Sequence, residues 1–242
     1  MITNPVLIAA AVLPAIYLLY KIYQADRVEK EPAGLLLSLA VCGIVATFLA
    51  MIAEMFGSVV VGLLFREGSV RYNFLFYFFV VAFSEEGFKY LLLKWRTWHS
   101  THFNCRFDGV VYAVFVSLGF ALWENISYVA LYGLEVALLR AVTAIPGHAC
   151  FGVFMGVWYG LAKKFDRFGD HEKAKRYGKL AVLCPVLLHG TYDFIASMEA
   201  AHFTWIFVVF IAVMFWISLR MVKRQAHHDH YLGEISYRSV IR

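Results

Sequence analysis

Long apolar runs separated by short polar segments dominate the chain. An α-helix needs about 20 mainly apolar residues to cross the ~30 Å hydrocarbon core of a bilayer. The runs reach that length repeatedly, so the pattern predicts an all-α bundle of about seven membrane spans, eight at most. The predicted spans are residues 5–23, 33–56, 73–94, 109–132, 136–162, 179–198 and 203–221.

Three details qualify these spans. Pro146 lies inside the fifth and predicts a break or kink near Ala144–Gly147. The apolar segment 57–65 is too short to cross, so it either extends the second span or lies at the interface. The run Pro5–Tyr23 has neither the basic flank nor the clear cleavage site of a signal peptide, and we expect it to be a retained first span.

Composition supports an integral membrane protein. The chain is 61% hydrophobic and 16% charged, whereas a soluble domain has about 25% charged residues. We expect one membrane domain over residues 1–242. The net charge of +5 does not indicate nucleic-acid binding, because the basic residues are not gathered on one face. The four cysteines form no CxxC motif or disulfide pattern.

The distribution of Lys and Arg predicts the orientation. Eighteen of the 22 lie in or beside alternate loops or from Arg220 onward, where we expect a basic tail over about residues 222–242. The other side holds Arg66, Arg71 and Arg140, and Lys89 lies within a span. Because cytoplasmic loops carry the excess of basic residues, we expect the N-terminus outside and the C-terminus in the cytoplasm.

Ionisable residues interrupt several of these spans. Such residues cost several kcal/mol in hydrocarbon unless they pair or meet water, and by default they indicate a functional site. The residues are Glu85, Glu86, Lys89, Glu124, His148, His189 and Asp193. At 1.5 Å per residue, Glu85, Glu124, His148, His189 and Asp193 lie about 12–22 Å from the predicted cytoplasmic end of their spans. Groups from separate helices therefore share a similar depth near the middle of the membrane.

Glu85 and Lys89 stand at i,i+4 and are expected to pair, whereas Glu86 is rotated by about 100° and can point elsewhere. An ion pair that only fixes packing would explain Glu85 and Lys89. It would not explain the second carboxylate, and an acid beside a cation suits a general base for water activation.

The other intramembrane residues have structural alternatives as well. Glu124, followed by Asn125, is either a helix–helix hydrogen bond or a second acid of the same site. His148 begins a stripe with Gly152, Gly156 and Gly160, which favours a close helix crossing. His189 and Asp193 stand at i,i+4 as a self-satisfied pair, an orienting dyad or two metal ligands.

Two further acids are expected to have structural roles only. Asp108 is expected to cap the fourth span, because a helix N-terminus favours an acid. Glu54 is expected near an outer end of the second span, at the interface.

These motifs, in this order, resemble the PrsW family of bacterial intramembrane proteases, over nearly the whole chain. The matching elements are Glu85-Glu86-x-x-Lys89, Gly119-Phe-Ala-x-x-Glu124-Asn125, Pro-Gly-His148 and His189-Gly-x-x-Asp193, with Asp108-Gly109 and Asp26 through Glu31-Pro32. The resemblance implies a multi-pass protein of the bacterial cell membrane. It also implies an endopeptidase that makes the first cut in a single-pass anti-sigma factor during stress-induced sigma-factor release.

PrsW proteins in turn resemble the type II CAAX prenyl endopeptidases, in which two glutamates and two histidines activate water and stabilise an oxyanion. This implies Glu85 as base, Glu86 as its partner, and His148 and His189 as the catalytic histidines. Lys89, Glu124, Asn125 and Asp193 are expected to support them. Lys89 and Glu124 depart from the arginine and histidine of the prenyl endopeptidases. We expect no cofactor.

Several alternatives stay open at this point. Glu124, His148 and His189 could ligate zinc with Glu85 as base, although no HExxH motif is present. The same acids and histidines could line a proton or transport pathway, although no related halves of the kind common in transporters are visible. Haem held by His148 and His189, a CAAX-type processing protease and a bacteriocin-immunity role are the other readings.

Overall fold

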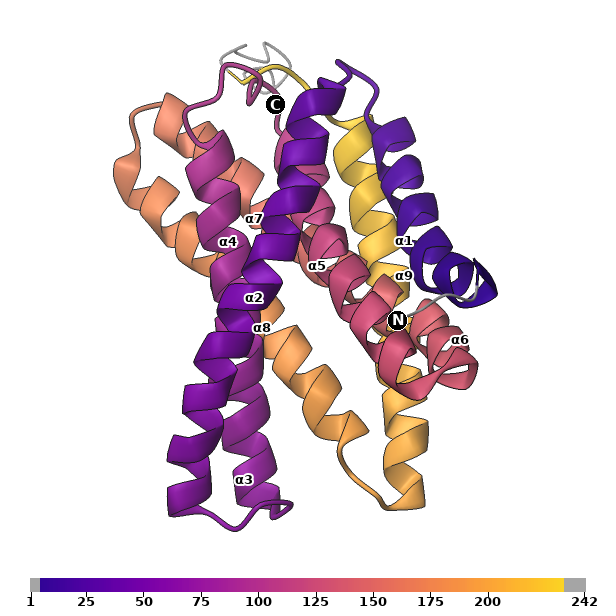
Figure 1. Cartoon of the computed structure of the whole chain (residues 1–242). Helices are drawn as coiled ribbons and strands as arrows, with labels where there is room; N and C mark the ends of the chain where they lie inside the picture. The colour runs from indigo at the N-terminus through magenta and orange to yellow at the C-terminus, as the bar shows by residue number, and fades with distance from the viewer. Residues whose placement is uncertain (1–4, 233–242) are drawn as a thin grey trace.

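A computed structural model describes residues 5–232, which form a bundle of α-helices with one π-helical segment (Figure 1). The elements are α1 (Pro5–Ala25), α2 (Ala33–Leu64), α3 (Val70–Leu75), η1 (Phe76–Ala82), α4 (Phe83–Thr97), α5 (Asp108–Tyr132), α6 (Leu134–Val142), α7 (Ala144–Arg167), α8 (His171–Ala196) and α9 (Ala201–His227). Within the described residues the only β pairing is an isolated bridge between Cys105 and Tyr231. The all-α prediction is confirmed.

Six helical segments are long and apolar enough to cross a membrane, with α6 and α7 counted together as one. A further uninterrupted helical run, α3–η1–α4, carries the acid pair. With this run included, the structure agrees with the prediction of about seven spans.

Some predicted boundaries differ from the structure. The segment 57–65 extends α2, which continues to Leu64. The fifth predicted span breaks at Thr143, between α6 and α7. Pro146 then falls in the first turn of α7, where a missing N–H costs nothing. The tail predicted from residue 222 begins later, because α9 runs to His227, and residues 233–242 of that tail lie outside the described residues.

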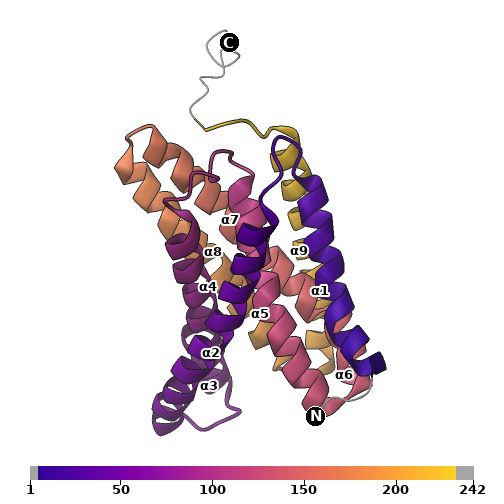
Figure 2. The ribbon, with the colours of Figure 1, turned by 45° about the horizontal axis from the view of Figure 1, so that its top comes forward.

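Helix α5 forms the centre of the bundle. Its first half is continuously buried, and α1, α2 and α7 pack around it. Figures 1 and 2 show α5 crossing the molecule between α2 on one side and α1 and α9 on the other. The two ends of α5 therefore lie at opposite ends of the bundle, with the buried polar residues between them.

Glycines allow the closest crossings of α5. A Cβ on Gly156 of α7 would collide with the backbone of Val110 and Gly109 of α5. A Cβ on Gly119 of α5 would collide with the backbone of Ala40 of α2. The close crossing predicted from the glycine stripe of α7 is thus confirmed, and it holds α7 directly against α5.

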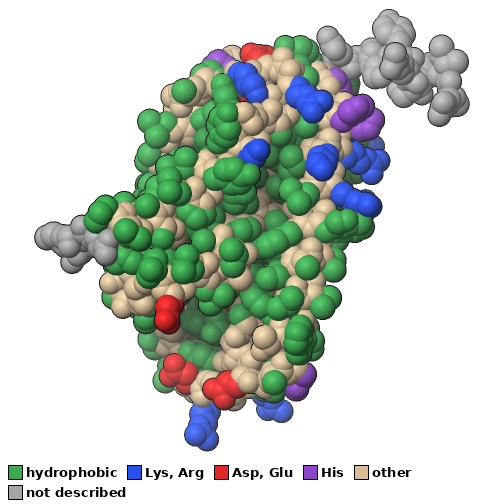
Figure 3. All heavy atoms as spheres, turned by 90° about the vertical axis from the view of Figure 1, so that its right-hand side faces the viewer, with side chains coloured by type: hydrophobic (Ala, Val, Ile, Leu, Met, Phe, Trp, Pro, Cys, Tyr) green, Lys and Arg blue, Asp and Glu red, His purple; other side chains and the backbone are tan. Residues whose placement is uncertain are grey.

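The outer surface is largely apolar. Figure 3 shows hydrophobic side chains over much of one face and most of its Lys and Arg side chains in the upper part. That upper end contains the loop after α1, the start of α5 and the end of α9 (Figure 1). These are the segments for which the sequence predicts a cytoplasmic location, and the orientation of the termini stays a prediction.

Asp108 does not cap α5 in the expected way. Its Oδ2 accepts hydrogen bonds from the backbone N–H groups of Asn104 (3.0 Å) and Cys105 (2.6 Å), both in the preceding loop. The carboxylate therefore orders the loop before the helix and satisfies none of the helix's own first N–H groups.

The glycine crossing generates a stability prediction. Gly156→Ala should destabilise the protein by about 1–3 kcal/mol, because the new methyl group meets backbone that must move. Gly62→Ala is the matched control in α2, since nothing lies within 4 Å of its Cβ position. Thermal unfolding in detergent measures both, and equal melting temperatures for the two variants would contradict the close crossing.

Candidate active site

Lys89 of α4 binds both glutamates of its own helix. Its Nζ lies 3.0 Å from Glu85 Oε2 and 2.7 Å from Glu86 Oε1. The predicted Glu85–Lys89 pair is confirmed. The sequence left the direction of Glu86 open; it contacts the same ammonium group, because the lysine stem is long enough to reach an acid at i−3 as well as one at i−4. One ammonium group therefore bridges two carboxylates, and Glu86 and Lys89 are fully buried.

A π-helical segment leads directly into this acid pair. Segment η1 ends at Ala82, and α4 begins at Phe83, two residues before Glu85. A π-helix spaces its hydrogen bonds at i→i+5 and turns the residues that follow onto a different face. Gly190 of α8 packs against η1, since a Cβ there would lie 2.6 Å from the Phe78 ring. The glycine thus lets α8 lie close to η1 and brings its polar residues to α4.

His189 of α8 lies between the two glutamates of α4 and Asp193 of its own helix. Its Nδ1 is 3.0 Å from Glu86 Oε1 and 3.8 Å from Glu85 Oε2, and its Nε2 is 3.2 Å from Asp193 Oδ2. Both ring nitrogens face carboxylate oxygens, which a doubly protonated ring satisfies. The ring also stacks on Phe151, with 4.7 Å between centroids. The predicted His189–Asp193 pairing is confirmed, and it orients a histidine that contacts the acids of α4.

His148 of α7 is held from both sides too. Lys89 Nζ lies 3.2 Å from its Nδ1, and Glu124 Oε2 of α5 lies 3.0 Å from its Nε2. An ammonium can only donate and a carboxylate only accept, so the contacts define a neutral ring that carries its proton on Nε2. Lys89 therefore links His148 to the two glutamates of α4.

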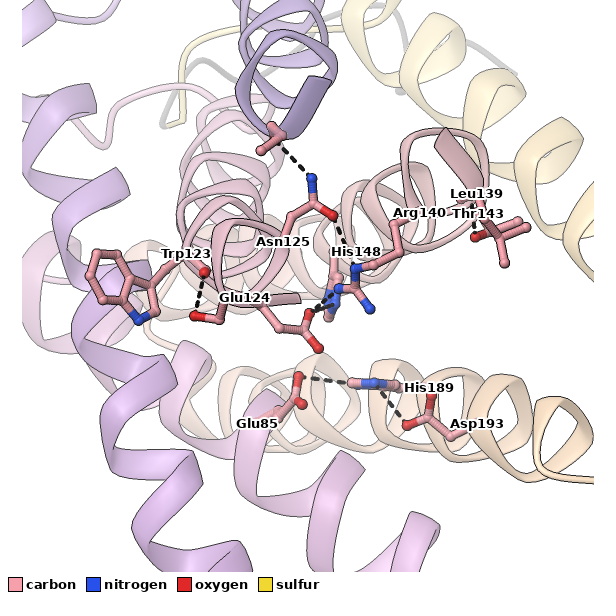
Figure 4. Close-up of polar contacts among 12 residues, drawn as sticks. Glu85, Trp123, Glu124, Asn125, Leu139, Arg140, Thr143, His148, His189 and Asp193 are labelled. Atoms are coloured by element: carbon pink, nitrogen blue, oxygen red, sulfur yellow. Dashed lines mark hydrogen bonds and ion pairs between the residues drawn. The ribbon is translucent and has the colours of Figure 1, made fainter. Parts of the chain in front are cut away.

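A second ion pair, between Arg140 and Glu124, fixes the carboxylate that contacts His148. Arg140 of α6 lies 2.9 Å from Glu124 Oε2 and donates from Nε to Asn125 Oδ1 at 3.0 Å. Asn125 in turn donates to the carbonyl oxygen of Ala11 in α1, at 2.8 Å. Asn125 is buried, and its hydrogen bonds connect α5 to both α1 and α6. Figure 4 shows this group facing Glu85, His189 and Asp193.

Part of this network borders a cavity of about 540 Å³. Glu85, Glu124, His148, His189, Asp193 and Arg140 line it together with aromatic side chains of α5, α8 and η1. Glu86, Lys89 and Asn125 are not among its lining residues and lie behind it. Of the two adjacent glutamates, Glu85 is thus the one that faces the cavity.

Two lining residues were not expected from the sequence. Glu54 lines the same cavity, and its expected place at the interface is wrong because α2 continues ten residues beyond it, to Leu64. Arg140 was counted only as a loop charge. Its position on the short helix α6, inside an otherwise apolar segment, is the signal that could have revealed it.

The fold and this site describe a multi-pass membrane protein with a buried glutamate–histidine centre. A family model described as "PrsW family intramembrane metalloprotease" matches residues 31–219. The chain is 34% identical to the protease PrsW of Halalkalibacterium halodurans, over 90% of this chain and 95% of that relative. It is 33% identical to the protease PrsW of Bacillus subtilis, over 90% and 94%, and 32% identical to that of Clostridioides difficile, over 90% and 91%. No solved structure matches it.

These matches identify the class of protein as an intramembrane protease. The chain belongs to the PrsW family of intramembrane proteases. The resemblance stated from the motifs is confirmed.

The family description raises the question of a metal. Glu85, Glu86, His148 and His189 each offer one ligand atom, and these atoms lie within 4.8 Å of one another. This set differs from the alternative zinc ligands expected from the sequence, since it omits Glu124. However, Lys89 Nζ lies within 3.2 Å of three of the four residues.

Both ring nitrogens of His148 and both of His189 also contact charged side chains. A metal ion would need a free imidazole lone pair and would face the ammonium charge. As arranged, the residues do not fit a bound metal.

The Lys89 bridge generates a second prediction. Lys89→Met should destabilise the protein by about 3–5 kcal/mol, because it leaves two buried carboxylates without their cation. Adding Glu86→Gln should restore part of that loss, since it removes one of the uncompensated charges. Unfolding measurements in detergent for the two single variants and the double variant give the coupling.

Lys173→Met provides the matched control. Lys173 pairs with Asp170 at 2.7 Å, but the lysine side chain is exposed, so its removal should leave stability unchanged. Additive effects of Lys89→Met and Glu86→Gln would contradict the bridge.

Proposed function

We propose that this protease cuts its substrate with a glutamate-activated water and that its substrate is a single-pass membrane protein. The observation that carries the proposal is the position of Glu85. It is the only residue of the Glu85–Glu86–Lys89 group that lines the cavity, and its carboxylate contacts a fixed ammonium.

Glu85 acts as the general base in this proposal. Its carboxylate takes one proton from a water molecule, and the water oxygen attacks the carbonyl carbon of the scissile peptide bond. The same proton then passes from Glu85 to the leaving amine nitrogen as the C–N bond breaks. Lys89 holds the carboxylate in place, and Glu86 holds Lys89 and His189 from behind.

The histidines have separate roles. His148 borders the cavity beside Glu85, and its neutral ring helps to position the water. In this proposal the Nδ1–H of His189 turns from Glu86 to the oxyanion that forms when the water attacks, while Asp193 keeps its contact with Nε2 and so orients the ring. Glu124 and Arg140 fix His148. Each of these groups stands in the low-dielectric centre of the bundle, where fixed charges act most strongly.

The substrate follows from the family resemblance. We propose an anti-sigma factor with one membrane span, cut as the first step in the release of its sigma factor. A membrane-anchored substrate agrees with a cavity that lies within the helical bundle and has a largely aromatic and apolar wall. The cell membrane itself is the second partner.

The test is cleavage of tagged single-pass anti-sigma factors co-expressed with the protein. We expect Glu85→Gln to lower cleavage by a factor of about 10² or more, because the base is lost while size and shape are kept. Glu86→Gln and His189→Ala should also lower it. Glu135→Gln is the matched control, since this acid lies on the exposed face of α6.

The possible results separate the two parts of the proposal. Full cleavage by Glu85→Gln would show that Glu85 is not the base. Cleavage of other membrane proteins, with every tested anti-sigma factor left intact by the wild type, would exclude the substrate and leave the catalytic assignment in place.

A further inference from the structure

Four acidic side chains gather at the end of the bundle away from the site. Asp26 and Glu31 lie in the loop between α1 and α2, Asp108 begins α5, and Asp229 follows α9. The first three are only 2%, 4% and 1% exposed. Asp108 and Glu124 are 16 residues apart on α5, which corresponds to about 24 Å along the helix axis. This acid cluster is therefore separate from the cavity.

The carboxylates of the cluster converge. One oxygen each from Asp26, Glu31 and Asp108 lie within 4.8 Å of one another, and Asp108 stands in the same relation to Asp229 and Cys105. Backbone N–H groups hold two of the acids in place. Asp108 Oδ2 accepts from the loop before α5, and Asp229 Oδ1 accepts from the N–H of Phe107 at 2.9 Å.

Four other oxygens of this cluster lack hydrogen-bond partners. Among residues 5–232, neither carboxylate oxygen of Asp26 has a hydrogen-bond partner, and the same holds for Glu31 Oε2 and Asp229 Oδ2. Buried acceptors without partners are rare and costly, and each requires an explanation. The buried carboxylate of Asp26 in particular lies close to those of Glu31 and Asp108, and it has no hydrogen-bond partner among residues 5–232.

Basic side chains near the cluster do not supply the missing contacts. Lys30 Nζ donates to the backbone oxygens of Tyr23 (2.5 Å) and Asp26 instead of the carboxylates. Arg106 is nearby, but its Nε has no partner of its own in the described residues. Neither of these basic groups therefore satisfies the unpartnered carboxylate oxygens of Asp26.

We propose that Asp26, Glu31 and Asp108 bind a hard divalent cation of the Mg²⁺, Mn²⁺ or Ca²⁺ class, with Asp229 beside it. Carboxylate oxygens are the ligands that these cations prefer. The bound cation joins the loop after α1, the first turn of α5 and the segment after α9. It thus acts as a clamp on three segments far apart in sequence, and it takes no part in peptide hydrolysis.

The experiment uses Mn²⁺ as the probe on the chelator-treated full-length protein in detergent. Electron paramagnetic resonance counts free Mn²⁺ during a titration. We expect one bound equivalent in the wild type and an affinity lower by at least about tenfold in Asp26→Asn and in Glu31→Gln, because each loses a charged ligand. Glu172→Gln is the control, an exposed acid in the first turn of α8 and outside the cluster, and it should bind like the wild type.

Two further measurements keep the test decisive. Mg²⁺ should raise the melting temperature of the wild type and not that of Asp26→Asn, and without metal the variant should melt no lower than the wild type, since it removes an unpaired charge. A Glu86→Gln variant should keep the Mn²⁺ site, because the intramembrane acids do not form it. Absence of Mn²⁺ binding, equal binding by Asp26→Asn, or loss of binding in Glu86→Gln would overturn the proposal.

Discussion

The ammonium group of Lys89 is the contact on which the site depends. It reaches Glu85, Glu86 and His148 within 3.2 Å and lies 3.7 Å from the centre of the Phe120 ring. Two carboxylates one residue apart in a membrane helix would repel each other strongly without a cation. Because the lysine side chain has no exposure to solvent, its charge is not screened by water. The lysine thus allows both acids to remain in the bundle, and it leaves Glu85 facing the cavity.

The helix crossings then determine which groups meet this lysine. Glycines of α5 and α7 let the two helices approach backbone to backbone, which places His148 next to Glu124. Gly190 allows α8 to approach η1, and His189 of α8 reaches Glu86. In a membrane there is no hydrophobic force to press helices together, so close packing of small residues and polar contacts must do it. The geometry of the site therefore depends on these glycines as well as on the polar side chains.

Much of this was predictable because the bilayer imposes simple rules. Span length and charge placement revealed the helices, and unexplained charges within them revealed Glu85, Glu86, Lys89, Glu124, His148, His189 and Asp193. The structure brings all of these together. Periodicity alone could not show the π-helical segment before Glu85, since the apolar run is continuous there. It also left open whether residues 57–65 extend the second span, and Glu54 was misplaced for that reason. Arg140 joins the site only through the break at Thr143.

The nature of the catalytic centre turns on whether positive charge is supplied by Lys89 or by a metal. The most direct measurement is the cleavage rate of purified protein whose zinc, iron and cobalt content is determined by mass spectrometry in the same samples, with Mg²⁺ kept in the buffer. We expect the rate per molecule to stay constant as these transition metals are removed to well below one equivalent. A rate that falls in proportion to the metal content and returns when zinc is added back would contradict the lysine-based centre.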